Sequence, residues 1–171
     1  MDGRPPPRWR VTSGRQAPEE VARLLAMLPT WFGIDASNAE YIERAHALPT
    51  YLAWPGNDEE PGHEEPRHPA GVLLAARHFP EAAEVYLLAV DPTAHRSGAG
   101  RSLLRALESD LIAEGVEFLQ VKTLGPSNPD AGYAKTRAFY AAMGFRPLEE
   151  IHGLWDPGSP CLLMVKRLPP R

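Results

Sequence analysis

A glycine-rich turn near the middle of the chain is the stretch whose residue types best suit chemistry. Residues 97–100, Ser-Gly-Ala-Gly, follow an apolar and β-branched run at residues 85–90 that predicts a strand. After the turn, leucines recur at helical spacing: Leu103, Leu104, Leu107 and Leu111. A helix that begins after glycines presents uncovered backbone N–H groups and the positive end of its dipole. The turn therefore predicts an anion site, with phosphate as the favoured ligand; the alternative is a tight turn that binds nothing.

Two common phosphate-binding motifs are missing from this turn. A dinucleotide-binding fingerprint needs a third glycine three residues after the second, and that position is Leu103. A Walker A loop needs Gly-Lys-Ser/Thr after a four-residue gap, and the chain contains no such stretch. A different phosphate ligand is therefore indicated.

The turn and a later segment together resemble the GNAT superfamily of acetyl-CoA-dependent N-acetyltransferases. Residues 95–100, His-Arg-Ser-Gly-Ala-Gly, are similar to the family's pyrophosphate loop, Arg/Gln-x-x-Gly-x-Gly/Ala, with His95 in place of Arg or Gln. Residues 136–145 resemble its later helix, which carries Phe-Tyr-x-x-x-Gly-Phe; Tyr133 stands where the family often has Asn. The motifs extend the resemblance over residues 84–145, and the order of elements extends it over the rest.

This resemblance implies a single GNAT-like α/β domain over residues 8–171. Residues 1–7, with three consecutive prolines, are expected to be a disordered tail. The fold would be a mixed central β-sheet of about seven strands, splayed at the fourth and fifth strands, with helices on both faces.

Hydrophobic patterns and turn residues predict the remaining elements. One helix opens at Pro18, ends at Pro29 and buries one face, formed by Val21, Leu24, Leu25 and Leu28. A second opens at a capping box, Ser37 and Glu40, and continues to Leu48. Strands are predicted at residues 9–12, 50–54, 72–78, 117–124, 145–151 and 161–168, the last two as a closing pair.

By the same resemblance, acetyl-CoA (CoA) would lie along the central strand and the loop. Backbone groups of the strand would pair with pantetheine in a gap opened by a bulge, and backbone N–H groups of residues 96–102 would hold the pyrophosphate. Arg96 and Arg101 stay charged beside it, whereas His95 is a cation only when protonated. The cofactor-binding residues so implied are Leu88, Ala89, Val90, His95, Arg96, Ser97, Gly98, Ala99, Gly100, Arg101, Ser102, Asn128 and Tyr140.

Tyr140 is the candidate general acid for acetyl transfer. The thioester supplies activation, so an amine would attack it directly, without an acyl-enzyme. A phenol of pKa about 10 can protonate a departing thiolate whose thiol has a pKa of about 8.5. The alternative is a tyrosine at the edge of the core.

Glu84 is the candidate base. A lysine-like amine, of pKa about 10.4, is mostly protonated at neutral pH, so a proton must be removed before attack. Period-two alternation places Glu84 on the strand face of Tyr86 and Leu88. Glu81, His78 or a water chain could take the same role, and a solvated carboxylate at the strand end is the structural alternative.

Trp31, Phe32 and Trp155 are candidate substrate-binding residues, since they lie in or near segments that border the acceptor side of GNAT proteins. They could line an apolar pocket, or they could pack in the core. The acceptor is an amine of a small molecule or a peptide, and its identity stays open.

Composition excludes several classes of partner. The net charge of −4 argues against nucleic acid, and no apolar run approaches the roughly 20 residues that span a bilayer. Cys161 is the only cysteine, so it forms no internal disulfide and fits a reducing compartment. The Arg- and Pro-rich start does not resemble a signal peptide. We expect a cytoplasmic monomer or homodimer with no membrane partner.

No metal is expected. His63, Glu64 and His68 lie in an acidic segment whose prolines prevent the helix that would align them as ligands.

Three rival functions remain beside acetyl transfer: a CoA-binding regulatory module without catalysis, an acyltransferase for a longer acyl-CoA, and a non-enzymatic interaction domain.

Overall fold

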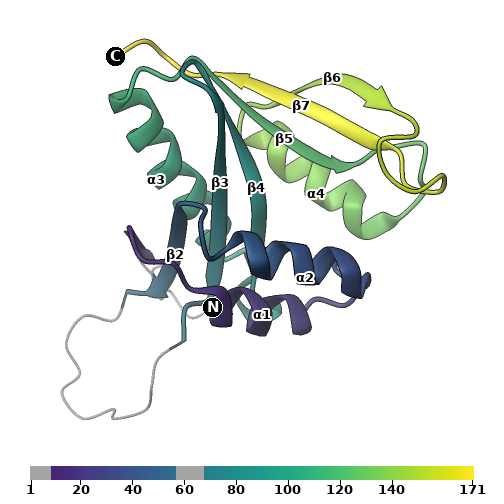
Figure 1. Ribbon diagram of the computed structural model, residues 1–171, viewed down its shortest axis with the longest axis horizontal. Coiled ribbons are helices and arrows are strands. Elements are labelled where there is room, and N and C mark those ends of the chain that lie inside the picture. The colour runs from purple at the N-terminus through teal and green to yellow at the C-terminus, as the bar shows by residue number, and fades with distance from the viewer. Residues whose placement is uncertain (1–8, 57–67) are drawn as a thin grey trace, which may run out of the picture. The chain divides into compact units, whose positions relative to one another are not determined.

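A computed structural model describes residues 9–56 and 68–171 (Figure 1). Its elements are β1 (Trp9–Ser13), α1 (Pro18–Ala26), α2 (Asp35–Arg44), β2 (Thr50–Pro55), β3 (Gly71–Phe79), β4 (Ala82–Val90), a 3-10 turn (Pro92–Ala94), α3 (Ala99–Ala113), β5 (Phe118–Leu124), α4 (Ala131–Ala142), β6 (Arg146–Ile151) and β7 (Cys161–Arg167). The strands form a seven-stranded mixed sheet in the order β1-β2-β3-β4-β5-β7-β6, with helices around it. The predicted fold class is confirmed.

The chain divides into two compact units, and three elements contribute residues to both. Of the described residues, the first unit comprises 9–56, 68–74 and 87–107, and the second comprises 75–86 and 108–171. Strands β3 and β4 and helix α3 each cross the boundary, so neither unit is a continuous segment.

The first unit is built on an antiparallel ladder. Strand β1 pairs with β2 over its whole length, and residues Thr50 to Ala53 of β2 pair with the start of β3. Helix α1 begins at Pro18, whose missing N–H costs nothing in a first turn. The apolar face of α1 is buried as its spacing predicts, with Val21, Leu24 and Leu25 at most 2% exposed. The helix ends at Ala26, before the predicted stop at Pro29, and Leu28 beyond its end is 3% exposed. Each such side chain stabilises the fold by about 1.5–3 kcal/mol relative to an exposed one.

Helix α2 differs from the prediction at both ends. It begins after Ile34, and Ser37 lies inside its first turn instead of capping it. The Nδ2 group of Asn38 donates to the carbonyl of Phe32 at 2.8 Å, tying the helix start to the preceding turn. The helix ends at Arg44, and Leu48 closes one further turn by donating its N–H to the Arg44 carbonyl. The capping-box prediction was therefore wrong, although Leu48 is buried as expected.

The second unit holds the rest of the sheet. Strands β4 and β5 pair in parallel over residues 82–85 and 118–121, which fixes Glu84 opposite Gln120. Strand β7 pairs antiparallel with both β5 and β6, so the predicted closing pair is confirmed and β6 is the edge strand. A register shift interrupts β6 between Pro147 and Glu149, which suits a proline that has no N–H for the ladder.

Within the described ranges, no helix combines the length and the apolar character needed to cross a bilayer.

Candidate functional site

The glycine-rich turn has the geometry that its sequence predicts. After β4, the 3-10 turn leads into residues 95–98, and α3 begins at Ala99. Gly98 adopts a φ of 96°, a conformation open to glycine and strained for other residues. Arg96 has a φ of 62°, which makes it the one non-glycine residue with positive φ in the described part of the chain. Residues held in such conformations occur often at ligand sites.

Hydrogen bonds inside the turn show which N–H groups are available to a ligand. The Ser97 N–H and hydroxyl both donate to the Ala94 carbonyl, at 3.3 and 2.5 Å. The Trp9 indole donates to the Ser97 carbonyl at 3.0 Å, and the Ser102 N–H donates to the Gly98 carbonyl at 3.0 Å. Ser97 and Ser102 are thus already engaged, and the N–H groups of residues 98–101 at the start of α3 are the ones suited to an anion.

His95 has contacts that the sequence did not reveal. Its Nε2 atom lies 2.8 Å from the Val90 carbonyl, to which it donates, and its ring meets Trp31 edge-on at 5.6 Å between centroids. The imidazole therefore links the end of β4 to the segment after α1, within the first unit. Beside it, Leu88 and Val90 are half-buried while Ala89 is buried, as strand alternation predicts.

Glu84 lies in a polar cluster in the second unit. Its Oε2 atom accepts hydrogen bonds from His78 Nε2 at 2.5 Å, Lys122 Nζ at 2.8 Å and Gln120 Nε2 at 3.2 Å. The Glu84 side chain is 6% exposed, against 42% for His78 and 30% for Lys122. The parallel register explains the cluster, because Gln120 faces Glu84 and Lys122 follows two residues later on the same strand face.

The electrostatics of this cluster keep Glu84 ionised. Burial alone raises the pKa of the Glu84 carboxyl, but hydrogen bonds from Lys122 and His78 outweigh it, so the pKa lies below its ordinary range. Cys161 on β7 feels the same charges, and burial raises the pKa of its thiol. A neutral, buried thiol is an inert group.

Tyr140 is the most buried residue of α4. It is 5% exposed and contacts the rings of Phe139 at 5.3 Å and Phe145 at 5.4 Å. Phe139 and Met143, which the helical spacing places on an inward face, are only half-buried. The helix is fixed at its start by Asp130, whose carboxylate accepts the Tyr133 N–H at 2.9 Å.

Asn128 holds two loops of the second unit together. Its Nδ2 group donates to the Gly158 carbonyl at 3.0 Å, and its Oδ1 atom accepts the Asp130 N–H at 3.1 Å. Trp155 lies in the same loop as Gly158 and is 40% exposed. The Asn128 side chain is therefore engaged within the protein.

Trp31 and Phe32 are half-buried in the first unit, and Phe32 meets Tyr41 edge-on at 6.0 Å. Pockets of about 260 and 340 Å³ in this unit are lined mainly by β1, β2 and the start of α1, and their linings include none of the predicted site residues.

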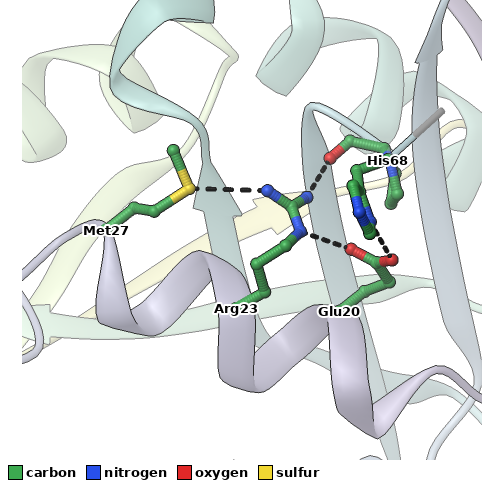
Figure 2. Close-up of polar contacts among 5 residues, drawn as sticks. Glu20, Arg23, Met27 and His68 are labelled. Carbon is green, nitrogen blue, oxygen red and sulfur yellow. Dashed lines mark hydrogen bonds and ion pairs between the residues drawn. The ribbon is translucent and has the colours of Figure 1, made fainter. Parts of the chain in front are cut away.

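His68 forms a hydrogen bond with the side chain of Glu20. Its Nδ1 atom lies 2.7 Å from one oxygen of the Glu20 carboxylate, and Arg23 binds the other oxygen (Figure 2). Arg23 also donates to the Pro69 carbonyl. Within residues 9–56 and 68–171, no cluster of three or more His, Cys, Asp or Glu side chains could hold a metal ion. His63 and Glu64 lie outside the described residues.

The family follows from the sequence match. A model of the GNAT family of acetyltransferases matches residues 21–145, most of the chain. The chain belongs to the GNAT acetyltransferase family. No curated protein is similar enough in sequence to give a match.

Solved structures of GNAT acetyltransferases share this fold. A GNAT acetyltransferase from Desulfovibrio desulfuricans superposes with a TM-score of 0.74 at 19% identity, over 95% of this chain and 99% of its own. The ribosomal-protein-S18-alanine N-acetyltransferase of Escherichia coli gives 0.67 at 17% identity, over 94% of each chain. A Bacillus subtilis acetyltransferase in complex with CoA gives 0.65 at 18% identity, over 95% of this chain and 100% of its own.

Proposed function

We propose that this protein transfers the acetyl group of acetyl-CoA directly to an amine acceptor. The observation that carries the proposal is the glycine turn at the start of α3 in a chain of the GNAT family, with Gly98 at a φ of 96°. The CoA held by the similar Bacillus subtilis protein supports the choice of ligand.

The residues present fit such a ligand. Backbone N–H groups of Gly98, Ala99, Gly100 and Arg101 would hold the pyrophosphate at the positive end of the α3 dipole. The exposed side chains of Arg96 and Arg101 add permanent charge. Backbone groups of Leu88, Ala89 and Val90 would pair with the pantetheine arm, and Asn128 would act indirectly through the loops it joins.

Two protein groups would move protons in the reaction, for which the bound thioester supplies an activated acetyl group. Tyr140 gives its phenolic proton to the thiolate as the carbon–sulfur bond breaks. The Glu84 site takes a proton from the ammonium form of the acceptor before attack, and the nitrogen loses its second proton to water as the carbon–nitrogen bond forms. Tyr140 is then reprotonated from solvent. For each turnover two protons leave the ammonium, one reaches the thiol and one is released to solvent.

The candidate acceptor-binding residues are Trp31 and Phe32 in the first unit and Trp155 in the second. Each has a partly exposed ring that offers apolar contact to a small-molecule or peptide amine. The net charge of −4 favours a cationic acceptor, since charges on the protein raise the local concentration of the opposite sign.

A screen tests this function. The protein is incubated with acetyl-CoA and amines of several classes, namely amino acids, polyamines, aminoglycosides and peptides with free N-termini or lysines. Thiol release and the mass of the product are then measured. We expect an acetylated amine whose amount equals the thiol released. CoA binding without turnover across the panel would favour a regulatory module without catalysis. Faster turnover of a longer acyl-CoA would favour an acyltransferase for that donor.

A further inference from the structure

We infer that His78 accepts the amine proton through its Nδ1 atom, and that Glu84 holds the imidazole in place as its partner. This inference rests on the proposed acetyl transfer and deepens it, since it assigns the proton to a residue other than the carboxylate.

Glu84 itself is poorly suited to accept the amine proton. Its Oε2 atom already receives donors from Lys122, His78 and Gln120, and its side chain is 6% exposed. Those bonds favour the ionised form and make the carboxylate a weaker base. If Glu84 took a proton, it would lose the negative charge that these hydrogen bonds stabilise.

The contact with Glu84 fixes the tautomer of the neutral His78 ring. A carboxylate only accepts hydrogen bonds, so the Nε2 atom that lies 2.5 Å from Glu84 must carry a hydrogen. In the neutral ring the lone pair is then on Nδ1. Among the described residues nothing hydrogen-bonds this atom, and the side chain is 42% exposed, so Nδ1 is open to a substrate or to water.

The charged groups around His78 are compatible with a proton on its Nδ1 atom. Glu84 is paired with Lys122, and a proton on Nδ1 makes His78 a cation held against the same carboxylate. Cys161 stays neutral because burial raises the pKa of its thiol. Neighbouring Arg77 is bound to Glu114, so its charge is shared elsewhere. His78 is therefore the member of this cluster whose second ring nitrogen is left exposed for a proton from the acceptor.

The proton balance is complete with these groups. The ammonium form of the acceptor gives one proton to Nδ1, and the neutral amine then attacks the thioester. The nitrogen loses its second proton to water as the carbon–nitrogen bond forms and the carbon–sulfur bond breaks. The imidazolium then releases its proton to water. Tyr140 donates a separate proton to the thiolate and recovers one from water, so the protein is unchanged after each cycle.

The test compares His78→Asn with a matched control, His68→Asn. His68 is also an exposed imidazole bound to a glutamate, Glu20 (Figure 2). Turnover of the best amine from the screen is measured against pH, together with the rise in melting temperature caused by CoA. We expect His78→Asn to lower kcat by about 10²-fold at neutral pH. The kcat of this variant should recover at higher pH, where the amine itself deprotonates. CoA should still raise its melting temperature. His68→Asn should leave the profile unchanged.

A pH–rate profile of His78→Asn with the shape and height of the wild type would overturn the inference. His78→Gln serves as a second variant, with the same expectation. In the wild type, nitrogen NMR of the imidazole should show the proton on Nε2, and finding it on Nδ1 would also overturn the assignment. Failure of the proposed function is distinct, because the wild type would then show neither a CoA effect nor turnover.

Discussion

At the scale of single residues, the Glu84 cluster joins charge to burial. Period-two alternation alone predicts that Glu84 shares a strand face with Tyr86 and Leu88. It did not reveal Lys122 and Gln120 as partners, because these depend on the parallel register of β4 and β5. Their period-two spacing on one strand was the only available signal, and many surface strands have the same spacing.

Glu84→Gln should lower stability in a pH-dependent way. A carboxyl whose pKa is depressed in the folded state stabilises the fold above its unfolded-state pKa, and this stabilisation is lost as pH falls through the folded-state pKa. We expect the free energy of unfolding to fall by about 1–3 kcal/mol near neutral pH. The difference from wild type should shrink in acid.

Denaturant unfolding at a series of pH values measures this effect. Glu81→Gln is the control, since that side chain is exposed at the neighbouring turn. A Glu84→Gln loss of the same size in acid and at neutral pH would show that the charge of Glu84 contributes nothing.

Tyr140→Phe keeps the ring contacts with Phe139 and Phe145 and removes the acidic hydroxyl. We expect turnover to fall by about 10²-fold or more while CoA still raises the melting temperature. Tyr133→Phe, on the same helix, should change turnover little. An unchanged kcat in Tyr140→Phe, with chemistry shown to limit the rate, would remove this residue from the mechanism.

At the scale of elements, the turn between β4 and α3 was predicted better than its interior contacts. Gly98 and the leucine spacing after it are local signals, so the sequence identified them. The bonds from Trp9 to the Ser97 carbonyl and from His95 to the Val90 carbonyl bring together groups that no local pattern relates. At α2 a local pattern gave the wrong result: the capping box predicts a helix start at Ser37, but the N-cap is Ile34, three residues earlier.

Substitutions in this turn should have opposite effects on stability. Arg96 has a φ of 62°, so Arg96→Gly relieves a backbone cost of about 1–2 kcal/mol, partly offset by the greater freedom of glycine in the unfolded chain. Gly98→Ala at a φ of 96° should instead destabilise the fold by about 1–2 kcal/mol. Denaturant unfolding without CoA measures both. Arg96→Ala is the control that removes the guanidinium and keeps the strain; destabilisation by Arg96→Gly would contradict this account.

At the scale of the whole molecule, the order of strands and helices follows from the sequence. Hydrophobic periods and turn residues give each element, and the seven-stranded order agrees with the family that the motifs resemble. The division into two units could not be foreseen, because its boundary runs through β3, β4 and α3. Hydrophobic patterns show which residues are buried, but not which cluster each one joins.

Binding of CoA at the glycine turn is the claim on which the proposed function depends, and a melting curve tests it most directly. A ligand at about 100 times its Kd stabilises the folded state by about 2.7 kcal/mol. CoA should therefore raise the melting temperature of the wild type. Gly100→Glu, which places a carboxylate in the anion site, should abolish the rise, while Ala113→Glu at the far end of α3 should keep it. A wild-type melting temperature unmoved by millimolar CoA would contradict the account.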